Sequence, residues 1–116
     1  MQYLLLIYEN EKRWSTMSEA DQGKEYAEYT SFTEDIKKSG KLVAGDALQP
    51  TTTATTLRIR DGKRITTDGP FAETKEQLGG YYLVKAKDLD EALDLAARIP
   101  AVRAGSIEVR PIMVFE

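Results

Sequence analysis

The segment Thr66–Gly80, which reads TTDGPFAETKEQLGG, carries more information than any other part of this 116-residue chain. It combines three glycines and a proline, which favour turns, with one aromatic side chain and four charged ones. We therefore predict that it forms a loop with a functional role and not a regular helix or strand.

A β-hairpin is predicted immediately before this segment. Residues Thr55–Arg60 alternate between apolar and polar types, Asp61-Gly62 is a strong signal for a hairpin turn, and Lys63–Thr67 returns as a second strand. The apolar side chains of this hairpin that we expect to face inward are Leu57, Ile59 and Ile65.

Four further strands are predicted elsewhere in the chain from their apolar and β-branched residues. Pro111 lies within the last of them and indicates an edge strand or a bulge, because proline cannot donate a backbone hydrogen bond. These strands are Met1–Tyr8, Lys41–Leu48, Gly80–Ala86 and Ser106–Phe115.

Two helices are predicted, Glu19–Ser39 and Leu89–Arg98, with Ser18 and Asp88 placed as N-caps. The segments between strands and helices, including the charged stretch Glu9–Met17, are predicted as loops. The side chains that we expect to be buried are Tyr26, Tyr29, Phe32 or Thr33, and Ile36 on the first helix, and Leu89, Ala92, Leu93 and Ala96 on the second.

The order of elements predicts an α+β fold in which two helices cover one face of a single antiparallel sheet. Several strands, such as Met1–Tyr8, nevertheless offer apolar side chains to both faces. Since two helices cannot cover both faces, a second copy of the chain is the simplest cover for the other, and we predict a homodimer.

Composition excludes several classes of protein and site. With 41% hydrophobic and 30% charged residues, the chain is typical of a globular domain, and its net charge of −3 offers no basic stripe for direct binding of nucleic acid. The chain has no cysteine and no histidine, so we expect no disulfide, no transition-metal centre and no cofactor held by these ligands. It has no segment that predicts a signal peptide or a membrane span, so we expect a cytoplasmic protein.

The segment Thr66–Gly80, with Asp68-Gly69-Pro70-Phe71 at its centre, resembles the signature of the DGPF proteins of the YCII-related family. The resemblance extends to Met1–Tyr8 at the start, to Asp88–Ala97, and to Ile99–Gly105 and Glu108–Pro111 near the end. It implies a ferredoxin-like antiparallel sheet with two helices on one face, pairing as a dimeric α/β barrel. Some relatives in the wider family are thought to be enzymes that use a His–Asp pair, but this chain has no histidine to supply it.

Asp68 has two readings. As a carboxylate beside a cleft it could act as a catalytic acid or base. As a turn residue it could instead accept a hydrogen bond from the N–H of Phe71, because the intervening Pro70 has no N–H. Both roles are open on the sequence alone, and Asp68 is the one candidate catalytic residue.

Other side chains are candidates for binding a small molecule in a pocket between sheet, loop and partner chain. The alternative for each is structural: strand tyrosines and Phe71 commonly pack in a core, and charged side chains commonly face solvent. Asp68, Glu73 and Glu76 could also form an oxygen site for Mg²⁺ or Ca²⁺, although their spacing matches no established motif, so we predict no metal site. The candidate binding residues are Tyr8, Trp14, Phe71, Glu73, Lys75, Tyr81 and Arg110.

Two classes of function remain open on the sequence. One is an enzyme or binding protein for a small molecule, with Asp68 as acid or base. The other is a regulatory or interaction module without catalysis, since the resemblance also links DGPF proteins to systems built on extracytoplasmic-function sigma factors. A third reading gives the signature loop no role beyond building the dimer.

Overall fold

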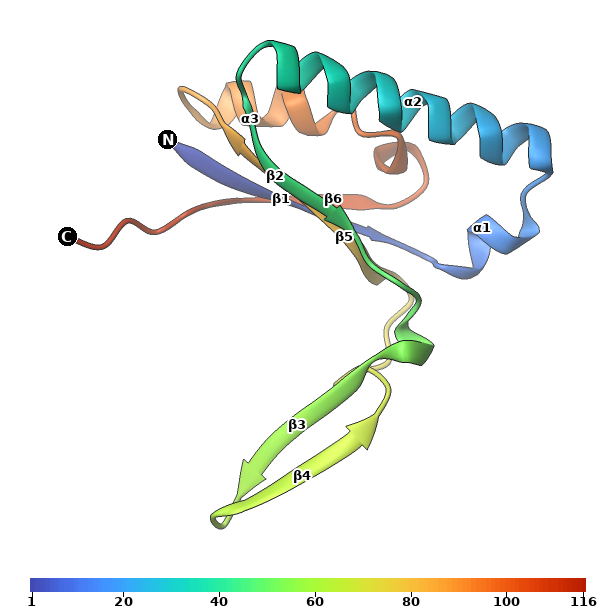
Figure 1. Ribbon diagram of the computed structural model, residues 1–116, viewed down its shortest axis with the longest axis vertical. Coiled ribbons are helices and arrows are strands. Elements are labelled where there is room, and N and C mark those ends of the chain that lie inside the picture. The colour runs from blue at the N-terminus through green and yellow to red at the C-terminus, as the bar shows by residue number, and fades with distance from the viewer.

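The computed structural model describes all 116 residues and shows a four-stranded antiparallel sheet covered by helices on one face, with a separate hairpin below it (Figure 1). The strands of the main sheet lie in the order β2-β5-β1-β6. Their bounds are β1 Gln2–Glu9, β2 Leu42–Ala47, β5 Gln77–Lys85 and β6 Ser106–Pro111. This α+β arrangement is the predicted ferredoxin-like one, and Pro111 ends an edge strand as predicted.

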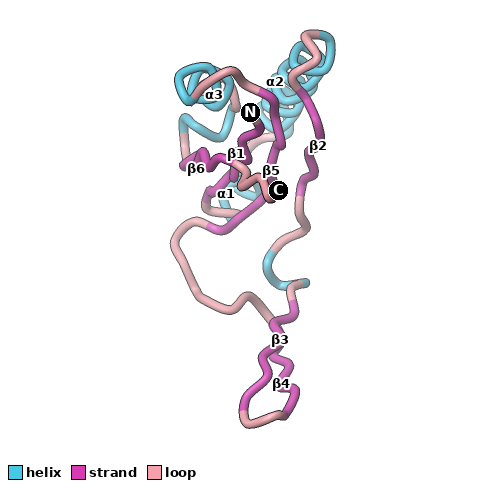
Figure 2. The backbone as a smooth tube through the Cα atoms, turned by 90° about the vertical axis from the view of Figure 1, so that its left-hand side faces the viewer, coloured by secondary structure: helices cyan, strands magenta, loops and turns pink.

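The two longer helices lie together on one side of this sheet (Figures 1 and 2). Helix α2, Glu19–Lys38, begins at the predicted N-cap Ser18, and α3, Leu89–Ala96, begins at the predicted N-cap Asp88. Short helical segments that were expected to be irregular are α1 (Lys12–Thr16), η1 (Thr51–Thr53) and η2 (Pro100–Arg103). No helix is long and apolar enough to cross a membrane.

The core lies between the helices and the upper face of the sheet. Tyr3, Leu5 and Ile7 of β1 alternate toward the helices and are buried, while the residues between them face the side that has no helix. Val84 on β5 and Phe32 on α2 complete the centre of this core. Each chain therefore buries only one face of its sheet.

Two of the predicted helix faces were partly wrong. On α2 the residues that point at the sheet are Glu25, Phe32 and Ile36, whereas Tyr26 is 71% exposed. Positions 25, 29, 32 and 36 share one side of a helix, so the buried stripe runs through an acid and not through the tyrosine beside it. On α3 the buried residues are Ala92, Leu95 and Ala96, and the expected Leu89 and Leu93 face solvent.

The hairpin of β3 (Thr55–Arg60) and β4 (Lys63–Asp68), which we call the arm, has the predicted turn but not the predicted packing. Asp61 and Gly62 both have positive φ angles, as a two-residue hairpin turn requires. The three side chains expected to face inward are exposed, because the arm projects away from the main sheet (Figure 1). These side chains are Leu57, Ile59 and Ile65.

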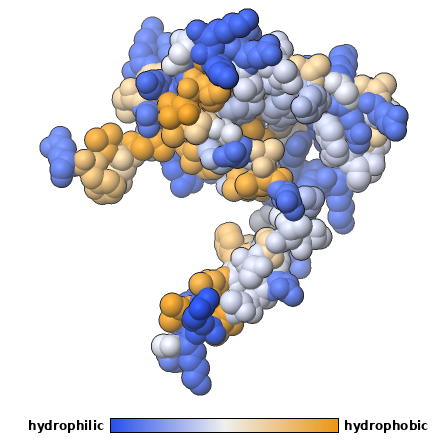
Figure 3. Space-filling model, in the orientation of Figure 1, coloured by the Kyte–Doolittle hydropathy of each residue, from blue (hydrophilic) through white to orange (hydrophobic).

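Two more expectations about the strands need correction. The predicted last strand, Ser106–Phe115, ends at Pro111, and the apolar residues after Ile112 are exposed (Figure 3). In contrast, β5 begins at Gln77, three residues earlier than expected. The last four residues of the signature segment are therefore strand and not loop.

Candidate functional site

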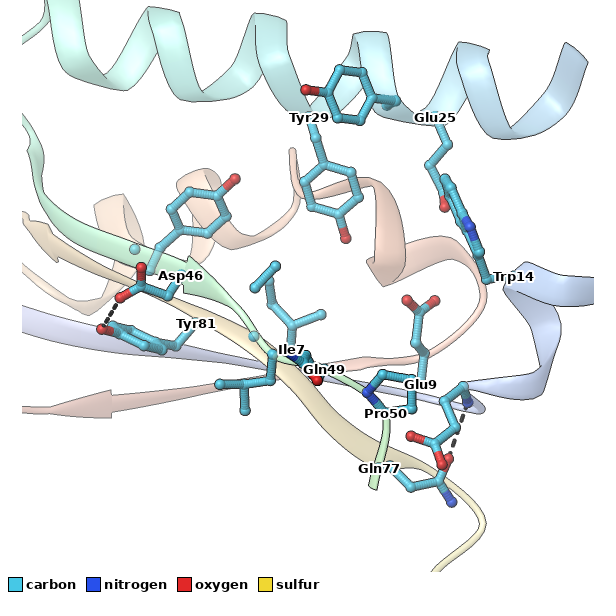
Figure 4. A pocket seen from close by; sticks show the side chains of 18 of the residues that line it. Ile7, Glu9, Trp14, Glu25, Tyr29, Asp46, Gln49, Pro50, Gln77 and Tyr81 are labelled. Atoms are coloured by element: carbon cyan, nitrogen blue, oxygen red, sulfur yellow. Dashed lines mark hydrogen bonds between the residues drawn. The ribbon is translucent and has the colours of Figure 1, made fainter. Parts of the chain in front are cut away.

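A cavity of about 620 Å³ opens between α2 and the end of the main sheet (Figure 4). Its walls come from β1, α1, α2, β2 and β5, so the fold assembles it from segments that are far apart in the sequence. A cavity of this size is typical for a site that binds a small molecule. The 19 lining residues are Ile7, Glu9, Glu11, Trp14, Glu25, Tyr26, Tyr29, Thr33, Gly45, Asp46, Ala47, Leu48, Gln49, Pro50, Gln77, Gly79, Gly80, Tyr81 and Tyr82.

An ion-pair cluster lies at the inner end of the cavity. Arg13 donates to Glu9 at 3.2 Å and to Glu25 at 3.0 and 3.4 Å. The Glu25 side chain is only 5% exposed, so Arg13 is what allows a carboxylate to stay buried on the core side of α2. The cluster joins the end of β1, helix α1 and helix α2 at one point.

The fold shifts the pKa of the Glu9 carboxyl in this cluster. Burial raises its pKa above the ordinary value of 4.5, and the nearby Glu25 carboxylate raises it further, while Arg13 opposes both. Figure 4 shows Glu9 pointing from the sheet into the cavity. A carboxyl with a raised pKa in a cavity can give up and take back a proton closer to neutral pH than an ordinary glutamate.

Tyr29 points into the same space from α2 (Figure 4). Burial raises the pKa of its hydroxyl, and the carboxylates of Glu9 and Glu25 raise it further. This hydroxyl therefore stays protonated at neutral pH and can donate a hydrogen bond to a ligand.

Helix α1 places the only tryptophan of the chain at the rim of the cavity. The helix is held at both ends: Glu11 accepts hydrogen bonds from the Thr51 N–H and hydroxyl, and Gln22 of α2 donates to the Trp14 carbonyl. The Glu11 N–H donates to Gln77 of the signature segment at 3.0 Å. These contacts fix Trp14, which is 42% exposed, beside the opening.

Glycines make room where the strands of the cavity wall meet. A Cβ on Gly45 would lie 2.9 Å from the Tyr82 ring, whose hydroxyl is hydrogen-bonded to Thr33 at 2.8 Å. On the other face of β5 the Tyr81 hydroxyl donates to Asp46 at 2.6 Å, and this hydrogen bond raises the pKa of Tyr81. The two tyrosines are thus held in place by side chains from α2 and β2.

The structure brings two of the predicted site residues to this cavity, Trp14 and Tyr81. The others lie outside it. Tyr8 is half-buried on β1, and Arg110 is exposed on β6, where it forms an ion pair with Glu108. The remaining three, Phe71, Glu73 and Lys75, are exposed in the loop between β4 and β5, so the expectation that Phe71 plugs the core was wrong.

Asp68 also lies outside the cavity. It is the last residue of β4, opposite Thr55, and it is exposed. Its carboxylate accepts no hydrogen bond from the Phe71 N–H, so the predicted cap is absent. The turn is held by backbone groups instead: Gly69, at φ +99°, donates to the Ala54 carbonyl at 2.7 Å and accepts from the Thr56 hydroxyl at 2.9 Å.

The oxygen site considered for Asp68, Glu73 and Glu76 is not assembled, because no three acidic side chains gather closely enough to hold an ion. Glu76 instead accepts a hydrogen bond from the hydroxyl of Ser106 at 2.9 Å. The contribution of the signature segment to the cavity is made by Gln77, Gly79 and Gly80.

Sequence reasoning missed the acids of the cavity, above all Glu9 and Glu25. Glu9 was assigned to a solvated loop. For Glu25 a signal was available, because it lies four residues before Tyr29 and seven before Phe32, on the apolar side of the helix. An acid on such a stripe is unusual enough to mark a candidate site.

Comparisons with known proteins agree with this architecture. The family model described as YCII-related domain matches residues 1–116. An uncharacterized protein of Rhizobium meliloti (strain 1021) is 40% identical over 118 residues, which cover 100% of this chain and 95% of that protein. Among solved structures, the chain is similar to 5-chloro-2-hydroxyhydroquinone dehydrochlorinase (TftG) of Burkholderia phenoliruptrix AC1100 in complex with 2,5-dihydroxybenzoquinone. That similarity has a TM-score of 0.56 at 15% identity and covers 97% of this chain and 94% of the other.

Proposed function

The chain belongs to the YCII-related family, and on that premise we propose that it binds a small hydroxylated aromatic molecule in the cavity above the sheet, with Glu9 as the acid or base. The observation that carries the proposal is the perturbed Glu9 carboxyl inside a cavity lined by aromatic side chains. TftG, which shares the fold, was solved with a small ring compound, and this supports a ligand of that size.

The charges of the wall limit the ligand further. Four of the 19 lining residues are acidic, and none is lysine or arginine. Arg13 is already engaged by two carboxylates. An anionic ligand would meet negative charge without a free cation to offset it, so the proposed ligand is neutral or cationic. Four aromatic side chains at the wall can stack on a ring and attract a cation by their faces: Trp14, Tyr26, Tyr29 and Tyr82.

This proposal assigns a separate role to each of the main residues of the cavity. Glu9 takes a proton from a ligand hydroxyl or returns it, and Arg13 with Glu25 positions Glu9. Tyr29 donates a hydrogen bond to a ligand oxygen, and Trp14 covers the opening. Asp68, the acid–base candidate of the sequence, has no place in this cavity, and a role for it stays a prediction.

Fluorescence of the single tryptophan tests this proposal directly, because Trp14 lines the cavity. The probes are three phenols of similar size that differ in charge: hydroquinone, tyramine and 4-hydroxybenzoate. We expect hydroquinone and tyramine to change the Trp14 emission in a saturable way and 4-hydroxybenzoate not to. Glu9→Gln and Tyr29→Phe should each weaken the response, whereas Glu34→Gln, an exposed change on α2, should not.

Binding of 4-hydroxybenzoate alone, or of none of the three, would contradict the proposal. Saturable binding without any chemical change of the phenols would instead favour the non-catalytic alternative, for which the link to a sigma-factor system stays a prediction.

We also propose that the protein is a homodimer in which two sheets pack through their helix-free faces. In the single chain this face carries Leu4, Leu6 and Leu83, which are only half-buried. Leu4 and Leu83 are directly opposite each other in the ladder between β1 and β5, so they form one continuous apolar strip. Packing of two such faces is the arrangement of a dimeric α/β barrel.

A further inference from the structure

The arm, residues 55–68, extends away from the rest of the chain on the helix-free side of the main sheet (Figures 1 and 2). The radius of gyration is 16.3 Å, whereas a compact domain of this length has about 13 Å. A two-stranded hairpin that packs against nothing is at best marginally stable in water. The arm therefore has the shape of an element that is completed by another molecule.

One face of the arm carries a small apolar patch. Leu57 and Ile59 lie on the same face of β3 and are 52% and 62% exposed. The ladder register places Ile65 opposite Arg58, hence on the other face, so the two apolar side chains of β3 form a small separate patch. Figure 3 shows apolar surface gathered on the arm, well away from the core.

The charge of the arm points to the partner. It carries four basic and two acidic side chains, a net charge of +2, while the whole chain has −3, so the remainder of the chain carries −5. The position of the arm agrees, since a second copy seated on the helix-free face of the sheet would lie directly beside it (Figure 1). A nucleic acid in the same place would meet the negatively charged remainder of the chain.

We propose that the arm clasps a second copy of this chain, with Leu57 and Ile59 packed against the body of the partner. This inference rests on the proposed homodimer and adds a second contact to the one between the sheets. By the two-fold symmetry of a dimer, each copy gives one arm and receives one.

Sedimentation over a dilution series tests the proposal with two double variants. Leu57→Ser with Ile59→Ser removes the apolar patch of the arm, and we expect it to weaken dimerisation by at least about tenfold. Leu89→Ser with Leu93→Ser, which changes two exposed leucines on the outer side of α3, is the matched control and should leave dimerisation unchanged.

A wild-type monomer would overturn both the dimer and the clasp. A wild-type dimer whose affinity does not change in the Leu57/Ile59 variant would overturn the clasp alone and leave the packing of the sheets in place. The two outcomes are therefore distinguishable.

A spin label gives an independent measurement, because the chain has no cysteine of its own. A nitroxide attached to Ile59→Cys should be immobile in the dimer and become mobile on dilution, while one attached to Leu93→Cys should be mobile throughout. A label at position 59 that stays mobile in the dimer, or that only a DNA or RNA duplex immobilises, would overturn the clasp.

Discussion

Arg13 is the residue on which the cavity depends most directly, since it bonds two glutamates at once. Its side chain is 31% exposed, but that of Glu25 is only 5% exposed. Removing the arginine would leave a buried carboxylate without a partner. Such a change is costly because the charge has lost both water and its counter-ion.

We expect Arg13→Met to lower the free energy of unfolding by about 2–4 kcal/mol. Adding Glu25→Gln should recover part of the loss by removing the uncompensated charge. Arg103→Met is the control, because its ion pair with Glu28 is exposed at 59% and 35% and should be worth less than about 1 kcal/mol. Urea denaturation compares the variants, and equal losses for the two arginines would contradict this account.

The raised pKa of Glu9 makes its contribution to stability depend on pH. In the unfolded chain this carboxyl ionises near 4.5, whereas in the fold it keeps its proton to a higher pH. The folded state therefore binds more protons in this range. The stability contributed by protonated Glu9 is present below 4.5 and is lost as pH rises through the folded pKa.

We expect Glu9→Gln to gain stability relative to the wild type as pH rises from about 4 to about 7, since glutamine has no proton to lose. Unfolding curves at several pH values measure the difference in the free energy of unfolding between variant and wild type. For the control Glu34→Gln this difference should not change with pH. A difference that moved the opposite way would show that the ion pair with Arg13 outweighs burial and that the Glu9 pKa is lowered.

The Asp68 side chain is exposed and makes no hydrogen bond within the chain, so Asp68→Asn should change neither the melting temperature nor the response of Trp14 to phenols. Thermal unfolding and the Trp14 fluorescence titration with phenols, both carried out on Asp68→Asn and on the wild type, measure these two quantities. If Asp68→Asn lost the Trp14 response to phenols while its stability stayed unchanged, Asp68 would again be a candidate acid or base, as its place in the signature segment suggests.

At the scale of elements, the end of β1 that carries Glu9 and the segment after η2 approach each other very closely. A Cβ on Gly105 would lie 2.1 Å from the Tyr8 carbonyl oxygen and 2.8 Å from the Glu9 Cβ. Glycine at this position lets the backbone that follows η2 rest against the end of β1. The place of Glu9 thus depends on a glycine almost a hundred residues away in the sequence.

Gly105→Ala should therefore destabilise the protein by about 1–3 kcal/mol, because the strand end must move to admit the methyl group. Gly23→Ala is a matched glycine-to-alanine change, and we expect it to raise the stability of the protein. Gly23 is exposed within α2, nothing lies within 4 Å of its missing Cβ, and alanine favours the helix by about 0.5–1 kcal/mol. Thermal unfolding of both variants is the measurement, and a loss of stability for Gly23→Ala would count against this reading.

At the scale of the whole molecule, one chain leaves a sheet face, an arm and a tail without cover. The arm contributes Leu57, Ile59 and Ile65 to the exposed apolar surface, and the tail contributes Met113, Val114 and Phe115. Since such surface is costly in water, we expect these parts to form one surface for association.

One chain has a mass of 13.0 kDa, and light scattering should accordingly find twice that mass. A stable dimer of this kind should bury more than about 1,200 Å² in total. A monomer at micromolar concentration would contradict the homodimer, while leaving the cavity and its proposed ligand untouched.

The local patterns of the chain were enough to predict most of the elements. Caps at Ser18 and Asp88, the Asp61-Gly62 turn and the alternation in β3 depend on neighbouring residues only, and the structure has all of them. The family resemblance, carried by the long signature, implied the ferredoxin-like arrangement of these elements, which local patterns do not encode.

The cavity and the exposed arm depend on the tertiary structure. Whether an acid such as Glu9 or Glu25 is solvated or buried depends on which helix lies across which strand, and Arg13 meets both acids only in the folded chain. In the same way, the alternation of apolar and polar residues predicted an apolar face for β3, but this local pattern does not determine whether another segment packs against that face. Burial and perturbed pKa values arise from contacts between distant segments, so they become visible only once those segments have come together.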